Sequence, residues 1–255
     1  LNLTTPVASL VNDATPSFVF SSSEPGTIAY EGGCSSSVAE AVAGMHAITL
    51  NHLNDGQYST CKLRVTDAAG NFGILALGSF TVDTIAPTIT IATAIPLATN
   101  DNTPSFTIHL NEAGEASYSG ACSSASSSVS TGDNTIVLNS LSDGNYSDCE
   151  LTVTDAAGNS AQIGLGSFTI DTISPSLVLT SAVPTKTNDV TPSLSFSSNE
   201  AGEISYAGAC SSGTSSASAG GNTITLNSLS DGNYSACELT VTDAAGNTAP
   251  LALGS

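Results

Sequence analysis

Residues 141–159 read LSDGNYSDCELTVTDAAGN, and this stretch decides the fold of the chain. Asp143-Gly144 is typical of a tight turn, because Gly accepts positive φ and Asp can hydrogen-bond its own backbone. Cys149, Leu151 and Val153 then alternate with polar residues, which is the period-two pattern of a half-buried strand. Asp-Ala-Ala-Gly-Asn ends the stretch with a second turn. The stretch therefore predicts a turn, one β-strand and another turn.

The same stretch occurs three times at an interval of 88 residues, at 53–71, 141–159 and 229–247. The interval also holds for the cysteines that precede each copy, and no insertion or deletion interrupts it. The chain is therefore a tandem array, and its function should be sought first in features that repeat. The period predicts three units, residues 1–85, 86–173 and 174–255, the last without its final strand.

Each unit is predicted to be all-β, an antiparallel β-sandwich of about seven short strands, because turn signals recur every 8–12 residues without a helical period. Phe18 and Phe20 lie on one face of the second strand. The serine-rich stretch 123–130 is predicted to be a loop or a weak edge strand. Tyr146 suits a tyrosine corner, and its spacing of three residues from Cys149 predicts a bulge between them.

Short linkers that contain proline join the units, DTIAP at 83–87 and DTISP at 171–175. Such linkers leave little slack, so we expect the units to lie end to end as a rod. The chain has no initiator Met and no leader, which leads us to expect a segment of a longer protein or a processed product.

The third unit ends at Gly254-Ser255, before counterparts of the apolar pair Phe80 and Val82. Burying such a pair contributes about 3–6 kcal/mol, so its absence predicts an apolar slot in this unit. We expect the slot to be filled either by a continuation of the parent chain or by a strand from a neighbouring chain.

The net charge is −19, from 22 acidic and 3 basic residues. Nucleic acids and anionic membrane surfaces bind Lys and Arg, so neither is expected as a partner. No apolar run approaches the ~20 residues of a membrane span, so we expect no membrane insertion in this segment. The acidic surface permits cations as partners, although it could also serve only to keep the array soluble.

Six cysteines occur as three equally spaced pairs. Six cysteines allow 15 pairings in the abstract. The repeat argues for pairing within each unit, and zinc is not expected because no Cys-x-x-Cys or nearby His accompanies them. Disulfides imply an oxidising compartment, so we expect an extracellular or cell-surface location. The expected pairs lie within one sheet and are Cys34–Cys61, Cys122–Cys149 and Cys210–Cys237.

The Asp-Gly-x-Tyr turn, the Asp-Ala-Ala-Gly-Asn turn and the Asp-Thr-x-x-Pro linker resemble the bacterial Ig-like repeats of large secreted and cell-surface proteins, including adhesins and biofilm proteins. The resemblance covers the whole chain. It implies three tandem immunoglobulin-like β-sandwiches that act as a stalk, holding an adhesive tip away from the cell. It also implies joints that are made rigid by calcium.

Catalysis is not expected, because a hydrolytic triad needs a His placed between an acid and a nucleophile. His46, His52 and His109 are scattered and have no counterparts in the other units.

The predicted strand order brings three acidic positions of each joint together: the linker Asp, a Glu in the turn between the second and third strands, and the Asp after the Cys strand. Carboxylate, amide and backbone oxygens suit Ca²⁺, which takes 6–8 oxygen ligands. The alternative is that Asp and Asn only cap turns and that Glu is solvated. The candidate calcium ligands are Asp83, Glu112, Asp155 and Asn159 at the first joint and Asp171, Glu200, Asp243 and Asn247 at the second.

Two function classes remain, a structural spacer or fibre segment and a module that binds a glycan or a protein. A spacer should have near-identical units, whereas a binder should have one deviant loop rich in aromatic residues. Only residues 38–46 deviate noticeably, and His46 carries their one aromatic ring. The sequence therefore favours the spacer, with neighbouring Ig-like domains of the same or an adjacent chain as partners. A host or matrix ligand would bind through another region.

Overall fold

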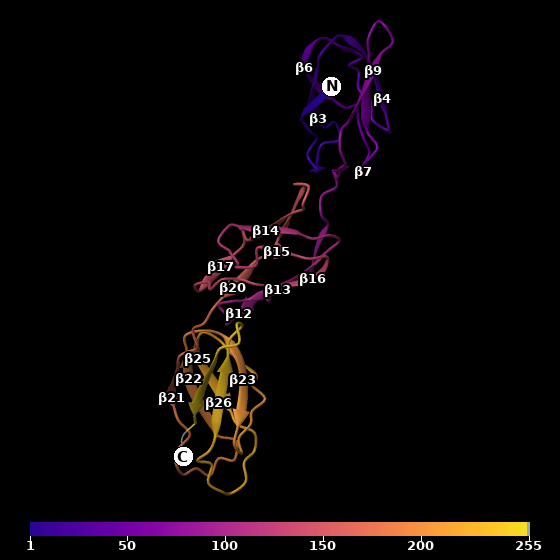
Figure 1. Cartoon of the computed structure of the whole chain (residues 1–255). Helices are drawn as coiled ribbons and strands as arrows, with labels where there is room; N and C mark the ends of the chain where they lie inside the picture. Colours follow the sequence, from indigo (N-terminus) through magenta and orange to yellow (C-terminus); the bar gives the residue numbers. More distant parts are fainter. Residues whose placement is uncertain (254–255) are drawn as a thin grey trace.

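The computed structural model describes residues 1–253, and all of its regular structure is β-strand. Figure 1 shows three β-units that follow one another along an elongated molecule. Their buried side chains form three separate hydrophobic clusters, one in each unit. Within the described range, no helix is long and apolar enough to cross a membrane. The predicted all-β array of tandem sandwiches is confirmed.

The first unit contains three small sheets, ordered β1-β3-β6, β2-β10-β7 and β5-β4-β8-β9. All pairings in them are antiparallel except that of β2 with β10, which is parallel. The strands are β1 (Asn2–Thr5), β2 (Leu10–Val11), β3 (Ser17–Ser22), β4 (Gly26–Glu31), β5 (Glu40–Ala41), β6 (Gly44–Thr49), β7 (Gly56–Tyr58), β8 (Lys62–Thr66), β9 (Phe72–Ala76) and β10 (Phe80–Val82).

The second unit repeats this arrangement as β11-β13-β16, β12-β20-β17 and β15-β14-β18-β19. The strands are β11 (Ile89–Thr93), β12 (Ala98–Thr99), β13 (Ser105–Leu110), β14 (Gly114–Ser119), β15 (Ser128–Val129), β16 (Gly132–Val137), β17 (Gly144–Tyr146), β18 (Glu150–Thr154), β19 (Ser160–Gly164) and β20 (Phe168–Ile170). β15 is a two-residue edge strand within the serine-rich stretch, as one of the two alternatives predicted.

The third unit contains two sheets in its described part, β21-β22-β25 and β24-β23-β26-β27. The small sheet that joins β2, β10 and β7 in the first unit has no counterpart among these residues. The strands are β21 (Leu177–Ser181), β22 (Ser193–Ser198), β23 (Gly202–Ala207), β24 (Ser216–Ala217), β25 (Gly220–Thr225), β26 (Glu238–Thr242) and β27 (Thr248–Ala252).

Alternating apolar residues build each core. Phe18 and Phe20 of β3 are buried while their neighbour Val19 is only partly covered, and Leu151 and Val153 of β18 are fully covered. Each strand thus has one face toward the other sheet and one toward solvent, which is the half-buried geometry of a sandwich.

The central stretch forms two strands in two different sheets, so the prediction of one strand after a turn is wrong. β17 pairs with β20, whereas β18 pairs with β14 and β19. Cys149 lies between them, and Gly144 begins β17. The chain changes sheets over residues 147–149, which separate the end of β17 from the start of β18. This crossing, and not the predicted bulge, explains the spacing.

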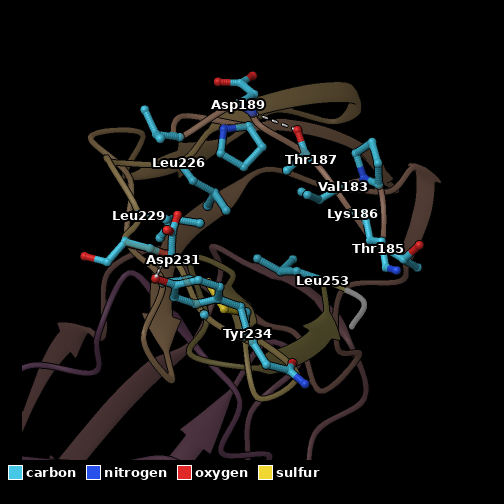
Figure 2. Close-up of a pocket in the computed structure, with 18 of the residues that line it drawn as sticks. Val183, Thr185, Lys186, Thr187, Asp189, Leu226, Leu229, Asp231, Tyr234 and Leu253 are labelled. Atoms are coloured by element: carbon cyan, nitrogen blue, oxygen red, sulfur yellow. Dashed lines mark hydrogen bonds between the residues drawn. A yellow bond between two sulfur atoms is a disulfide. The ribbon is translucent and has the colours of Figure 1, made fainter.

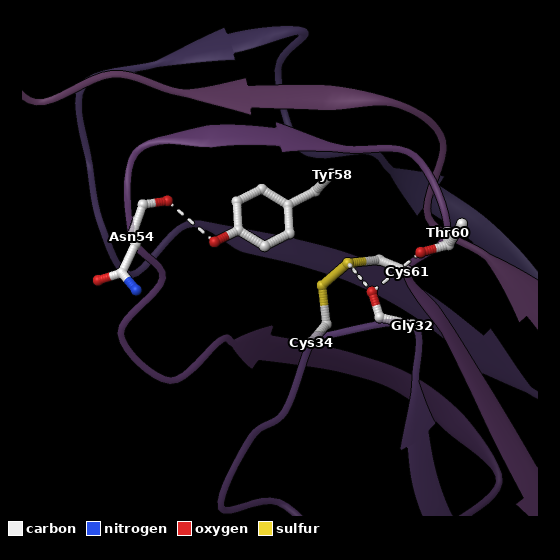
Figure 3. Close-up of a disulfide and its surroundings, with 6 residues drawn as sticks. All are labelled: Gly32, Cys34, Asn54, Tyr58, Thr60 and Cys61. Atoms are coloured by element: carbon white, nitrogen blue, oxygen red, sulfur yellow. Dashed lines mark hydrogen bonds between the residues drawn. A yellow bond between two sulfur atoms is a disulfide. The ribbon is translucent and has the colours of Figure 1, made fainter.

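The tyrosine corner is confirmed in all three units. The Tyr58 hydroxyl donates a hydrogen bond of 2.9 Å to the carbonyl oxygen of Asn54, four residues upstream (Figure 3). Tyr146 and Tyr234 donate equivalent bonds to Ser142 and Ser230. These bonds satisfy a hydroxyl whose ring lies against the core.

The structure joins the three expected disulfide pairs. Figure 3 shows Cys34 bonded to Cys61 beside the tyrosine corner. The other two bonds join Cys122 to Cys149 and Cys210 to Cys237. In the first unit the bond connects the end of β4 with the start of β8, which are neighbours in one sheet.

Candidate cation site at the unit joints

Three carboxylates meet at each joint between units. At the first joint, Asp83 follows β10, Glu112 lies in the turn between β13 and β14, and Asp155 follows β18. One oxygen atom from each lies within 4.8 Å of the others. Asp171, Glu200 and Asp243 form the same group at the second joint. The linker and the following unit thus both contribute to each group.

The Asp-Ala-Ala-Gly-Asn turn fixes the third carboxylate. Oδ1 of Asp155 accepts hydrogen bonds from the backbone N–H groups of Gly158 at 2.7 Å and Asn159 at 2.9 Å. The amide group of Asn159 donates to Oδ2 of Asp155 at 2.8 Å. Burial raises the pKa of Asp155, but the hydrogen bonds from Asn159 and the turn outweigh it and hold the pKa below its usual value.

Asn159 also connects the second unit to the incoming linker. Its Nδ2 donates a hydrogen bond of 2.8 Å to the carbonyl oxygen of Asp83. Asn247 makes the same bond to Asp171 at 2.7 Å at the second joint. Since both amide nitrogens donate hydrogen bonds, only the amide oxygens of these predicted ligands could contact a cation. Their role in this structure is to hold the linker against the next unit.

Sequence reasoning missed a second pair of linker anchors. Asp55 of the first unit accepts hydrogen bonds from the backbone and hydroxyl of Thr84, at 3.0 and 2.9 Å. Asn111 of the second unit accepts a bond of 2.7 Å from the backbone N–H of Thr88. Asp143 and Asn199 repeat these roles at the second joint. Their recurrence at the 88-residue interval was the signal that could have identified them.

The units also touch each other directly. The backbone N–H of Asn100 in the second unit donates a bond of 3.0 Å to the carbonyl oxygen of Ala245 in the third. At the first joint, a Cβ added to Gly158 would lie 3.3 Å from Nδ2 of Asn12. At both joints, therefore, the turn that holds the third carboxylate packs against a loop of the preceding unit.

Within residues 1–253, no basic side chain forms an ion pair with the acidic groups at the joints. In the described part of the chain, ion pairs join Lys62 to Glu31 and His109 to Asp133, and neither includes a joint residue. Asp155 and Asp243 are only 7% and 8% exposed. Burial, followed by repulsion from Asp171 and Asp243, raises the pKa of Glu200 above its usual value. Each joint therefore holds negative charge that a bound cation would neutralise.

The first unit has a partial version of the site. Glu24, Asp67 and Asn71 line a small hollow together with Leu1 and Phe72. Asp67 accepts similar turn hydrogen bonds, from the Asn71 side chain and from the backbone N–H groups of Asn71 and Ala69, and these lower its pKa. No linker carboxylate joins this group within the described residues, which makes Asp67 a natural control for the joints.

The residues at the joints fit a hard divalent cation. Three carboxylates that converge from separate segments match the oxygen-only ligands of Ca²⁺. The set contains no His or Cys, the ligands that favour zinc. A cation bound there would contact both the linker and the unit that follows it.

The comparison with known protein families agrees with this architecture. Residues 96–172 match the family model of the bacterial Ig-like domain. A crystal structure of Salmonella alpha-2-macroglobulin reacted with methylamine aligns with 99% of this chain and 23% of that chain, at 13% identity and a TM-score of 0.22. The chain thus spans about a quarter of that protein. No curated protein matches the chain. The family match covers the second unit, and the flanking units repeat its motifs and core strands, so residues 96–172 are similar to a bacterial Ig-like domain and the rest of the chain repeats that architecture.

Proposed function

We propose that this chain is a spacer segment of an extracellular or surface-attached bacterial protein, and that calcium makes its joints rigid. The observation that carries the proposal is the group of three carboxylates at each joint, with one member on the linker and two on the next unit. Disulfides in every unit support an oxidising location. The partners would be neighbouring Ig-like domains, and a host or matrix ligand would bind elsewhere. No catalytic role is proposed.

Calcium would act by removing hinge freedom. An ion that binds only the ordered joint stabilises it by RT ln(1 + [L]/Kd). At millimolar calcium and a Kd of about 10⁻⁴ M, this amounts to about 1.4 kcal/mol for each joint. That energy is small compared with the stability of a folded unit. It is nevertheless sufficient to shift the linker further toward its ordered conformation, because Asn159 and Asp55 already hold the linker by hydrogen bonds.

Calorimetric titration of the metal-stripped chain with calcium tests this proposal. We expect two bound ions, and we expect small-angle scattering to show a more rigid rod with calcium than with a chelator. Asp155→Ala should remove one ion and loosen the first joint, and Asp243→Ala should do so at the second. Asp67→Ala is the matched control and should change neither. If no calcium binds at millimolar concentration, the chain is a spacer without cation-dependent joints.

Calcium binding at the second joint should weaken as the solution is acidified. The pKa of Glu200 is raised by burial and by two neighbouring carboxylates, and calcium binds the ionised form. Protons should therefore compete as the pH falls from neutral toward the ordinary carboxyl pKa of about 4. Without calcium, acidification should have the opposite effect, since it should stabilise the fold. A group whose pKa is raised in the folded state contributes to folding stability at low pH, and this contribution is lost as the pH rises through the folded-state pKa.

Calcium titrations at several pH values measure this dependence. Glu200→Gln should lower the affinity at neutral pH and flatten the pH dependence at the second joint. An unchanged pH dependence in that variant would show that Glu200 does not contact the ion.

A further inference from the structure

One sheet of the first unit has an outer face that is basic and apolar. On β8, Leu63 is buried in the core, whereas Lys62 and Arg64 alternate with the core residues and lie on the outer face. On the neighbouring β9, Phe72 and Ile74 are 61% and 53% exposed. This sheet lies on the side of the first unit where Figure 1 labels β4 and β9. We call Lys62, Arg64, Phe72 and Ile74 the basic face.

The other units have different residues at these positions. Lys62, Phe72 and Ile74 correspond at the 88-residue interval to Glu150, Ser160 and Gln162 in the second unit. In the third unit they correspond to Glu238, Thr248 and Pro250. Ser160 and Thr248 are exposed although another unit precedes each of them, so this position is open to solvent within the array. The first unit therefore presents a surface that the repeat itself does not require.

Arg64 is the charged group of the basic face that is left without a partner. Lys62 lies 3.6 Å from Glu31 in an ion pair, whereas Arg64 forms no ion pair within residues 1–253. Nε of Arg64 is buried and has no hydrogen-bond partner. The guanidinium carbon lies 5.5 Å from the centroid of the Phe72 ring, in a cation–π arrangement. A carboxylate from another molecule is the group that best satisfies such a guanidinium, because it accepts two parallel hydrogen bonds.

The third unit presents a complementary face on the matching sheet. Glu203 of β23 and Glu238 of β26 lie on its outer side, and the exposed Pro250 of β27 lies beside them. Neither glutamate forms an ion pair in the described part of the chain. We call Glu203, Glu238 and Pro250 the acidic face. It combines unneutralised carboxylates with an apolar ring.

The second unit fits the basic face less well. Its Glu150 already accepts hydrogen bonds from the side chains of Gln162 and Ser119. Gln162 also replaces the proline of the third unit with a polar side chain. Binding of Arg64 to Glu150 would compete with these hydrogen bonds, whereas Glu238 is free of such competition among the described residues.

We propose that the basic face of the first unit binds the acidic face of the third unit in a second copy of this chain. Arg64 would bind the carboxylate of Glu238, and Phe72 and Ile74 would cover Pro250. Each copy carries a net charge of −19, so two copies repel one another over most of their surfaces. The basic face is the exception, and charge complementarity of this kind selects which surfaces meet.

The two faces belong to different units, so the contact is heterologous and can either close into a pair or continue from copy to copy. It goes beyond the proposed spacer function, because it names a lateral partner for the rod. The contact does not use the cavity of about 560 Å³ in the third unit. The described lining of that cavity includes Val183, Tyr234 and Leu253 but no residue of the acidic face (Figure 2).

Sedimentation equilibrium of the whole chain, in the presence of a chelator, tests the proposal. We expect reversible self-association that weakens as salt is added, because salt screens the charges that bring the two faces together. Arg64→Glu and Glu238→Arg should each lower the association constant at least about tenfold, since each places like charges opposite one another. An equimolar mixture of the two variants should associate again, because the exchanged charges are complementary.

Two further variants separate this contact from general effects of charge and folding. Glu150→Arg changes the net charge by the same amount as Glu238→Arg, and it should leave the association unchanged. Phe72→Ser/Ile74→Gln gives the first unit the residues of the second, and it should weaken association about fivefold while the chain stays folded, because both side chains are exposed.

Three results would overturn the proposal: a wild-type chain that is monomeric up to about 1 mM, a mixture of the charge variants that does not associate, or a Glu150→Arg chain as impaired as Glu238→Arg. The chelator keeps the joints free of calcium in all of these measurements. Failure here therefore leaves the proposed calcium sites untouched, and absence of calcium binding leaves this contact untouched.

Discussion

Removing the disulfide of one unit should lower the free energy of unfolding of that unit by about 3–4 kcal/mol. Each bond joins cysteines separated by 27 residues and therefore closes a loop of that size in the unfolded chain. An unfolded unit without the bond gains the conformational entropy that the bond had removed. For a small domain, whose total stability is about 5–15 kcal/mol, this is a large fraction.

The double variant Cys122→Ala/Cys149→Ala isolates the effect in the second unit. Chemical denaturation followed by hydrogen exchange should show that this unit unfolds at lower denaturant, while the first and third are unchanged, because the three hydrophobic clusters are separate. Reduction of the wild-type protein is the control, since it breaks all three bonds and leaves side-chain volume nearly intact. A loss below about 1 kcal/mol would contradict the loop-closure explanation.

Gly120→Ala should destabilise the second unit by about 2–5 kcal/mol. Gly120 has a φ of 75°, and an added Cβ would lie 2.1 Å from the carbonyl oxygen of Asp148. The left-handed conformation costs a residue with a side chain about 1–2 kcal/mol, and relief of the clash requires backbone movement beside Cys122 and Cys149. Gly32 and Gly208 make the same close approach in the other units.

Gly132→Ala is the matched control for this substitution. Gly132 has a φ of 93° but no atom within 4 Å of an added Cβ, so only the conformational cost of about 1–2 kcal/mol should appear. Denaturation of both variants under the same conditions compares the two costs. Equal losses of stability in the two variants would mean that the clash with Asp148 is relieved at no energetic cost. The left-handed backbone conformation would then be the only reason that alanine is disfavoured at Gly120.

Both predictions bear on the proposed spacer, because a stalk requires units that stay folded while its joints change stiffness. The disulfide and the glycine turn lie at the end of β14 and the start of β18, away from the carboxylates that follow β18. Weakening a unit and weakening a joint should therefore be separable by experiment.

The sequence alone determined the features that depend on period and local pattern. The 88-residue interval predicted a tandem array and the pairing of Cys122 with Cys149, because equal spacing in every unit leaves pairing within the unit as the simplest arrangement. Alternation of apolar residues predicted the buried faces of β3 and β18. The convergence of Asp83, Glu112 and Asp155 also followed from the predicted strand order.

Tertiary structure decided the strand pairings and joint contacts, because these depend on residues that are distant in the chain. β17 is a strand because β20 pairs with it and Phe168 stacks on Tyr146; in the third unit, without that partner in the described residues, the same motif is not a strand. The bond from Asn159 to Asp83 joins residues 76 positions apart, and no local pattern marks it. Strand pairing and joint contacts satisfy backbone groups across the fold, so residues outside the motif select the structure that the motif adopts.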